Sequence, residues 1–424
     1  MTLADPSSLA SNRPQTDAAK AAAKDQPRLR DVRLDFFRGI AMFIILFAHT
    51  PGNFFTSWIP ARWGFSDATE IFVFCSGMAS AIAFGSTYDR AGFALGTARV
   101  GYRVWQVYWA HVGLFFATVA LVVFLTDLDL TTRNYWGQLN LWPLFVESES
   151  WSNQNIWLSF MTLHYVPNYF DILPMYMVVL VMMPVVMALS RVNLWLVAGF
   201  MAITWAMGQT VITNALGLPH WNFVAEPWVQ ENGTQREWFF NPFGWQLIFF
   251  TGFAFMRGWL PKPPVSRVLI GVALCVVLAN IPLSHIGMRE LGFDWARDWR
   301  IENRGWISKS DFGLLRYVHF LALAYLCWVA AGDKGARLVA TGSGYLARVW
   351  QVILSLILKV GQQSLAVFIV SMFLARFSGF ALDVLERSVA TVTFVNIAGM
   401  GVLVLTAYTA SWFKSQPWRV RRAA

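Results

Sequence analysis

Arg38 and His49, in the first apolar run of the chain, are the residues best suited by type and spacing to chemistry. They are eleven positions apart, and the residues between them, GIAMFIILFA, carry no polar side chain. Eleven helical steps of about 100° return to nearly the same face, with a rise of roughly 16 Å. One helix face would therefore present a cation at one end and an imidazole at the other. Ionisable groups inside a membrane are costly and mark functional sites by default.

Each of the two residues has a structural and a functional interpretation. A buried guanidinium needs an anionic partner, and that partner is either Asp35, one turn earlier, or a phosphate group of a ligand. The His49 imidazole either bonds a carbonyl at the helix end or acts as nucleophile or general base. Pro51 and Gly52 follow it and would open the helix end to an aqueous reactant.

The composition predicts an all-α, polytopic integral membrane protein. Of 424 residues, 56% are hydrophobic and 13% are charged, whereas soluble domains average about a quarter charged residues. Residues 1–32 are predicted to form a disordered tail, residues 33–413 a transmembrane domain of about ten helices, and residues 414–424 a basic tail. Residues 349–359 have the character of an interfacial helix. The ten expected spans are 34–50, 68–86, 104–126, 171–189, 193–213, 242–257, 267–284, 312–331, 360–378 and 389–413.

The net charge of +9 is explained by orientation in the membrane. With both termini cytoplasmic, about two thirds of the Lys and Arg residues fall in inner segments and most of the acidic residues fall outside, as the positive-inside rule requires. A nucleic-acid partner is therefore not expected. Three cysteines in apolar runs and six scattered histidines give no disulfide pattern and no metal site.

Three residues of the third expected span are candidates for the inner side of a site. Arg99 and Arg103 are one turn apart at its inner end and would clamp phosphates, or else they are ordinary inside-facing charge. His111 lies two turns deeper, where it either packs and hydrogen-bonds or takes part directly.

Acidic residues at the outer start of the second expected span are candidates for orienting His49. Asp67 and Glu70 would lie near the imidazole in a compact arrangement, or they complement the helix dipole. In the same span Ser76 is interpreted as a close-packing residue and not as a nucleophile. Further candidates at outer helix ends, expected to bind an acceptor, are His164, Asp171, Arg316 and His319. Asp171 has the alternative of capping its own helix.

Several motifs resemble the membrane acyltransferase-three superfamily. RLDFFRGIA followed by hydrophobic residues and His is similar to its first helix, where Arg, ten residues and His recur; Arg38 and His49 match that spacing. EIFVFCSG at 70–77 is similar to the second-helix signature, with Val73 in place of an aromatic residue. GQQSL at 361–365 resembles a later helix start. DILPMY at 171–176 and RYVHF at 316–320 resemble the OpgC branch.

The resemblance implies transfer of an acyl group across the bacterial inner membrane. The donor would be acyl-CoA, in the OpgC branch succinyl-CoA, and the acceptor a hydroxyl of a periplasmic glucan or another glycan. Arg38 would bind CoA phosphate at the inner end, with Arg99, Arg103 and His111 as further donor-side residues, and His49 would receive the acyl group or act as base. A succinyl group would also need a second cation near the outer end, for which Arg62, Arg316 and Arg376 are the candidates.

Two other kinds of protein remain open from the sequence. A transporter or flippase of a glycan or lipid-linked sugar would also carry intramembrane Arg and His and broken helices. A non-catalytic scaffold for glucan synthesis would leave Arg38 and His49 without a role.

Overall fold

The computed structural model describes residues 31–419, and this part of the chain is all-helical. It contains no β-strand; a single isolated bridge joins Val224 and Glu237. The fold class predicted from the composition is therefore confirmed for the described residues.

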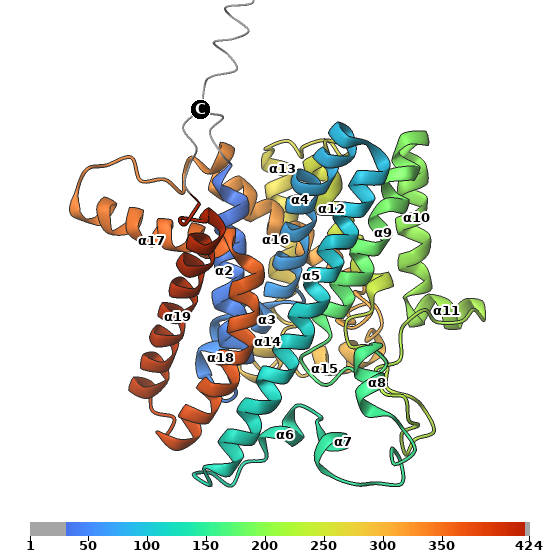
Figure 1. The fold of residues 1–424 in the computed structure, drawn as a ribbon. Coiled ribbons are helices and arrows are strands. Elements are labelled where there is room, and N and C mark those ends of the chain that lie inside the picture. Colours follow the sequence, from blue (N-terminus) through green and yellow to red (C-terminus); the bar gives the residue numbers. More distant parts are fainter. Residues whose placement is uncertain (1–30, 420–424) are drawn as a thin grey trace, which may run out of the picture.

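Long apolar helices form the bundle shown in Figure 1. They arise from runs of apolar residues in which every backbone polar group can be satisfied within the helix, as a lipid environment demands. Their bounds are α2 (Val32–His49), α4 (Ala68–Ser80), the π-helical turn η2 (Ala81–Gly85), α5 (Ser86–Asp127), α9 (Ile172–Val192), α10 (Leu194–Met207), α12 (Pro242–Arg257), α13 (Arg267–Ala279), α16 (Leu314–Ala331), α17 (Tyr345–Gln362), α18 (Ser364–Val384) and α19 (Val389–Ser415).

Most of the short helices gather at the end of the bundle where α2 ends, which we call the His49 end (Figure 1). The opposite end, where α2 begins, is the Arg38 end; the 3₁₀ turn η3 directly follows α16 and is in contact with α2. The short elements are η1 (Phe54–Trp58), α3 (Pro60–Trp63), α6 (Tyr135–Gln138), α7 (Trp142–Phe145), α8 (Ile156–Met161), α11 (Thr210–Leu216), α14 (His285–Arg289), α15 (Trp295–Glu302) and η3 (Asp333–Gly335).

The run from Ala68 to Asp127 is a helical hairpin. Gly92 interrupts it with φ 81° and ψ 178°, a conformation that favours glycine. Tyr88 Oη lies 3.1 Å from Thr97 Oγ1, and the Arg99 guanidinium lies 5.9 Å from the centre of the Phe84 ring. Residues 15 positions apart would be about 22 Å apart along one straight helix, so the chain folds back here. The two spans expected at 68–86 and 104–126 correspond to its two arms.

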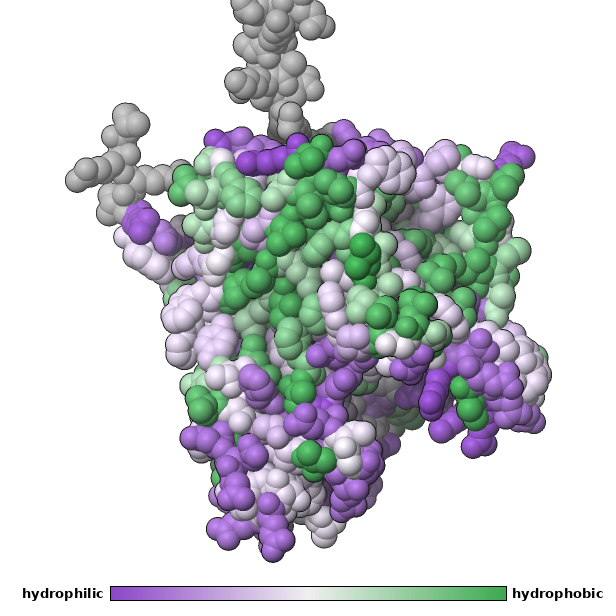
Figure 2. All heavy atoms as spheres, turned by 90° about the vertical axis from the view of Figure 1, so that its right-hand side faces the viewer, coloured by the Kyte–Doolittle hydropathy of each residue, from purple (hydrophilic) through white to green (hydrophobic). Residues whose placement is uncertain are grey.

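The outer surface of the bundle is apolar between two polar ends. Figure 2 shows a hydrophobic band over one face, with hydrophilic residues at the upper rim and over the loops below. Among the described residues five helical units are long and apolar enough to cross a membrane, or six if a bent pair counts as one span. Helix α2 carries three charged residues and α12 has only 16 residues, so neither is in that number. A membrane protein is supported; the total of ten spans stays a prediction.

The fifth expected span, 193–213, is not a straight helix. Helices α10 and α11 meet at an angle of 83°, across a break at Gly208 and Gln209. The break is stabilised because the Gln209 side-chain amide donates 2.5 Å to the carbonyl of Asp311 and the Trp205 indole donates 3.0 Å to that of Phe312. Hydropathy alone cannot detect this bend, because both arms are apolar.

Small residues allow two pairs of helices to approach closely. A Cβ on Gly77 would lie 1.9 Å from the Phe249 carbonyl oxygen, so α4 and α12 touch through backbone. A Cβ on Gly361 would lie 1.9 Å from the Asp35 carbonyl oxygen, so α17 is equally close to α2. Contacts of this kind replace the hydrophobic effect as a source of packing in a membrane.

Both ends of the described chain lie at the Arg38 end of the bundle (Figure 1). Lys414 Nζ donates to Gln363 Oε1 at 2.6 Å, and the neighbouring Gln362 donates to Asp35 at 3.4 Å. The expected tails are slightly too long, because α2 already begins at Val32 and α19 continues to Ser415. The predicted disorder of the first tail falls on residues 1–30, outside the described residues.

Candidate functional site

Helix α2 places Arg38 and His49 at opposite ends of the bundle. It begins after Asp31, whose carboxylate accepts from Arg33 N at 3.1 Å, and it ends where Thr50 and Pro51 leave the helix. His49 Nδ1 lies 2.8 Å from the Ile45 carbonyl oxygen. Since a carbonyl can only accept, Nδ1 carries the proton and Nε2 keeps its lone pair. Nε2 is the nitrogen available for chemistry.

Arg38 lines a cavity of about 330 Å³ at its end of the bundle. Its guanidinium donates to Ser364 Oγ on α18, while Arg103 donates to Gln106 Oε1 at 3.2 Å. The wall contains three arginines and no carboxylate, so the cavity suits a polyanion. Its lining residues are Arg38, Ser76, Ala79, Ser80, Ala83, Phe84, Arg99, Tyr102, Arg103, Gln106 and Tyr176.

Three of the four expected donor-side residues therefore line one cavity, and His111 does not. The His111 ring is fully buried and stacks on Phe160 at 5.3 Å between centroids, with Phe170 6.2 Å away. Neither of its nitrogens has a hydrogen-bond partner among the described residues. Its place is an aromatic cluster formed by α5, α8 and Phe170, which precedes α9; the periodicity of a single helix could not have indicated this.

Asp67 and Glu70 form a reciprocal capping box at the start of α4. Glu70 Oε2 accepts from Asp67 N at 2.8 Å, and Asp67 Oδ1 accepts from Thr69 N at 2.6 Å. Lys309 Nζ pairs with Asp67, and Arg316 Nη1 donates to Glu70 Oε1 at 2.7 Å. Burial opposes ionisation of Asp67, but the adjacent Lys309 ammonium holds the pKa of that carboxyl well below its usual value. Both readings of these acids, helix capping and proximity to His49, are compatible with this geometry.

The charged cluster, which we define as Asp67, Glu70, Lys309, Arg316 and Arg376, surrounds the end of α2 at His49. Lys309 and Asp67 are close enough to interact electrostatically with the imidazole. From α18, Arg376 donates to the backbone carbonyl of His49. The Tyr169 ring makes an edge contact with the imidazole, 5.6 Å between centroids, and the Arg376 guanidinium lies 4.6 Å from the centre of the same ring.

Tyr169 and Lys309 were not among the residues predicted for the site. Tyr169 lies in an irregular segment before α9 and has φ 73°, which is costly for a residue with a side chain. The segment is fixed by its neighbours: Val166 N donates to Ala225 O at 2.8 Å, and Asn168 N donates to Leu139 O at 3.0 Å. In the sequence, Tyr169 stands out only as one of many aromatic residues between the third and fourth expected spans.

The remaining acceptor-side candidates divide into those near the cluster and those apart from it. His319 lies one turn after Arg316 on α16, and its Nδ1 is 2.7 Å from Ser66 Oγ, immediately before Asp67. The Asp171 side chain makes no capping bond to its own helix; its carboxylate accepts from Phe239 N at 3.0 Å. His164 is exposed and bonds only to Thr162, two residues away, among the described contacts.

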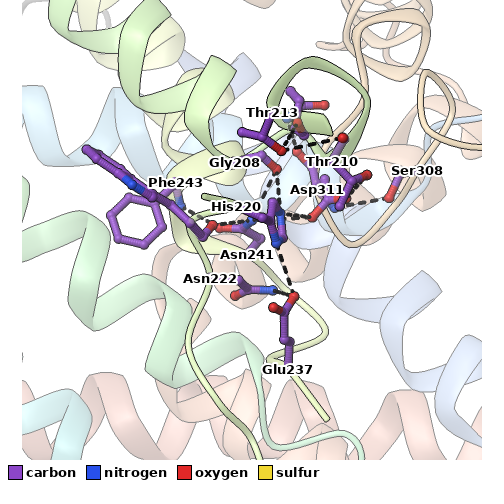
Figure 3. A network of polar contacts seen from close by, with 12 residues as sticks. Gly208, Thr210, Thr213, His220, Asn222, Glu237, Asn241, Phe243, Ser308 and Asp311 are labelled. Carbon is purple, nitrogen blue, oxygen red and sulfur yellow. Dashed lines mark hydrogen bonds and ion pairs between the residues drawn. The ribbon is translucent and has the colours of Figure 1, made fainter. Parts of the chain in front are cut away.

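A polar network in the loops that follow α11 and α15 contacts the neighbours of Lys309, and it contains a histidine that the sequence did not single out (Figure 3). His220 lies between Glu237 and Asp311, 3.3 Å from a carboxylate oxygen of each. Hydrogen bonds to Asp311 and Glu237 raise the pKa of His220 to about 10, so it is a cation at neutral pH. Asn241 N donates to Ser310 O at 3.0 Å. The loop that presents Lys309 is thus anchored at the two residues that follow it, Ser310 and Asp311.

The two ends of the site are separate in this structure. The Arg38 cavity ends at Ser76 and Tyr176 and does not include His49. Phe72 of α4 and Phe368 of α18 stack at 5.7 Å between centroids. Along their helices these rings lie between the level of Ser76 and Ser364 and the level of Glu70 and Arg376, so this stacked pair lies between the cavity and the His49 end.

These features define an integral membrane protein with a basic cavity at one end of its first helix and a histidine centre at the other. The family model described as OpgC protein matches residues 30–415, and the chain belongs to that family. Membership indicates a membrane acyltransferase that acts on glucans. No curated protein and no solved structure matches the chain.

Proposed function

We propose that this protein transfers a succinyl group from succinyl-CoA in the cytoplasm to a hydroxyl group of a periplasmic glucan across the bacterial inner membrane. One observation carries the proposal. Helix α2 contributes Arg38 to an arginine-lined cavity at one of its ends, and at its other end it holds His49, whose Nδ1 bonds Ile45 O and leaves Nε2 free. The phosphates of CoA match the three arginines, and the long pantetheine arm would run outward beside α2. The thioester would pass the stacked pair Phe72 and Phe368 on its way to His49.

Two routes give the same balance of atoms. In the first, His49 Nε2 attacks the thioester carbonyl, the carbon–sulfur bond breaks, and the CoA thiolate leaves; the sugar hydroxyl then displaces the imidazole, and its proton ends on the thiolate. In the second, Nε2 takes the hydroxyl proton while the oxygen attacks the thioester directly, and the imidazolium returns that proton to the leaving thiolate. Both need Nε2 unprotonated, which the bond from Nδ1 to Ile45 favours.

The test is transfer of labelled succinyl from succinyl-CoA to glucan by the purified protein. His49→Ala should lower turnover by about 100-fold or more, the size of a lost general base or nucleophile. His285→Ala, on the outer helix α14 and away from the cluster, is the matched control and should retain wild-type turnover. Undiminished transfer by His49→Ala would remove the catalytic assignment.

The same preparation, reconstituted in vesicles, addresses the transporter alternative. The 83° bend between α10 and α11 is the feature that a transporter would share. Glucan movement without acyl-CoA, together with no acyl transfer, would replace our proposal by that alternative.

A further inference from the structure

Arg376 contacts His49 and Tyr169, and among the described residues it has no acidic partner. In the same cluster Lys309 pairs with Asp67, and Arg316 pairs with Glu70. Among the residues that the structure describes, no carboxylate lies within ion-pair distance of Arg376. Yet only 8% of its surface is exposed. A buried, uncompensated charge is costly, and such groups are retained where a ligand supplies the counter-charge.

The position of Arg376 relative to His49 is fixed on three sides. Its guanidinium donates to the His49 carbonyl and covers the Tyr169 ring, which itself touches the imidazole. The next turn of α18 packs on the loop after His49, where a Cβ on Gly379 would lie 2.6 Å from Pro51. A guanidinium has five N–H donors in a planar fork, and the bond to His49 uses one of them.

We infer that Arg376 is a specificity-determining residue that binds the free carboxylate of the acyl group while its carbonyl carbon is at His49. This rests on the proposed function. A four-carbon monoacyl group of a dicarboxylic acid places its carboxylate carbon about 4 Å from its carbonyl carbon, since three carbon–carbon bonds of about 1.5 Å separate them. The imidazole and the guanidinium both contact the Tyr169 ring, 5.6 and 4.6 Å from its centre, so one short acyl group with a carboxylate can reach both. Arg62 and Arg316, the other candidates for this role, fit it less well. Arg316 already pairs with Glu70, and Arg62 lies on α3 and makes no contact with His49 or Tyr169 among the described residues.

The experiment compares succinyl-CoA with butyryl-CoA, which has the same carbon number and a methyl group in place of the carboxylate. The quantity measured is the ratio of kcat/KM for the two donors, with glucan as acceptor. Wild type should favour succinyl-CoA by at least about 10-fold, the range of hydrogen bonds to a charged group. Arg376→Gln keeps a donor for the His49 carbonyl but loses the charge, and its ratio should fall at least 10-fold toward one. Arg376→Lys should keep most of the preference, and Arg297→Gln, an exposed arginine on α15, should keep all of it.

The outcomes separate this inference from the proposed function. If wild type transfers neither acyl group, the function fails and the inference with it. If wild type favours succinyl-CoA but Arg376→Gln slows both donors equally, the function stands and the inference is overturned, because Arg376 then only holds the end of α2. Equal use of both donors by wild type overturns it too. A ratio that falls in Arg376→Gln alone supports it, provided that the variant elutes as a folded protein in detergent.

Discussion

The His49 imidazole owes its reactive form to a single backbone contact. The bond from Nδ1 to Ile45 O fixes the tautomer, and the edge of Tyr169 fixes the ring plane. Helix ends in proteins are commonly satisfied by such bonds, so this contact alone would be ordinary. The charged neighbours Lys309, Asp67 and Arg376 make the location unusual, because they bring three further ionic groups to the end of a membrane helix.

Arg38 is expected to control donor affinity. In Arg38→Gln the apparent KM for acyl-CoA should rise about 10- to 100-fold with little change in kcat, the value of one hydrogen bond to a charged group. Arg348→Gln, an exposed arginine on α17, is the control and should leave KM unchanged. An unchanged KM with reduced thermal stability would assign Arg38 to the packing of α2 on Ser364 instead.

Individual residues of the site differed in how far the sequence could predict them. Arg38 of the first expected span and Arg99 and Arg103 of the third were each expected at an inner helix end, and the structure brings them to one cavity; their role in binding a donor stays a prediction. Tyr169 and Lys309 come from loops far apart in the chain, and only tertiary folding brings them to His49. His111 lies in an aromatic cluster away from the arginine-lined cavity, because depth along a helix does not indicate which neighbour the side chain faces.

The helices themselves were easier to predict than their pairing. Helix α12 has the predicted bounds, 242–257, since Asn241 and Pro242 mark its start and Arg257 its last turn. The segment before the ninth span, expected to hold an interfacial helix over 349–359, is the longer helix α17, which lies across the bundle near the Arg38 end (Figure 1). Helix α17 crosses α2 at Gly361, and α4 crosses α12 at Gly77. The periodicity of the sequence does not reveal these crossings.

The α4–α12 crossing gives a prediction at this scale. Gly77→Ala should destabilise the protein by about 1–3 kcal/mol or more, because its methyl group would overlap the Phe249 carbonyl and force the helices apart. Gly271→Ala on α13, where a Cβ meets nothing within 4 Å, should be neutral or slightly stabilising through helix propensity. The measurement is the thermal midpoint in detergent. Equal midpoints for the two variants would contradict the close crossing.

The loops that follow α11 and α15 give the molecule a pH-dependent contribution to stability. His220 has a pKa of about 10 in the folded protein, above its usual 6.5, through hydrogen bonds to Asp311 and Glu237. Its contribution is therefore full below pH 6.5, declines as the pH rises from there, and is gone above about pH 10. Because Glu237 is half exposed, solvent screens part of it, and we expect about 1–2 kcal/mol at neutral pH.

His220→Gln tests this contribution. Its thermal midpoint should lie below that of the wild type at pH 6.5, and the difference should shrink steadily toward pH 10. His164→Gln, which changes an exposed histidine, should show no such trend. A difference that stays constant with pH would mean that His220 acts by packing and not by charge.

The orientation of the whole bundle decides the direction of the proposed reaction. Both ends of the described chain lie at the Arg38 end, together with the arginine-lined cavity, whereas the long loops lie at the His49 end (Figure 1). Charge distribution predicts that the Arg38 end is cytoplasmic, where acyl-CoA is made.

The test uses a variant in which Cys75, Cys275 and Cys327 are replaced, so that each added cysteine is the one that reacts. In this background Ser152→Cys, in the 128–155 loop, should react with a membrane-impermeant maleimide when only the outer membrane of the cells is opened. Thr341→Cys, exposed between η3 and α17, should react only after the inner membrane is permeabilised. The reverse pattern would place the cavity on the side without CoA, and a cytosolic donor could not then enter at Arg38.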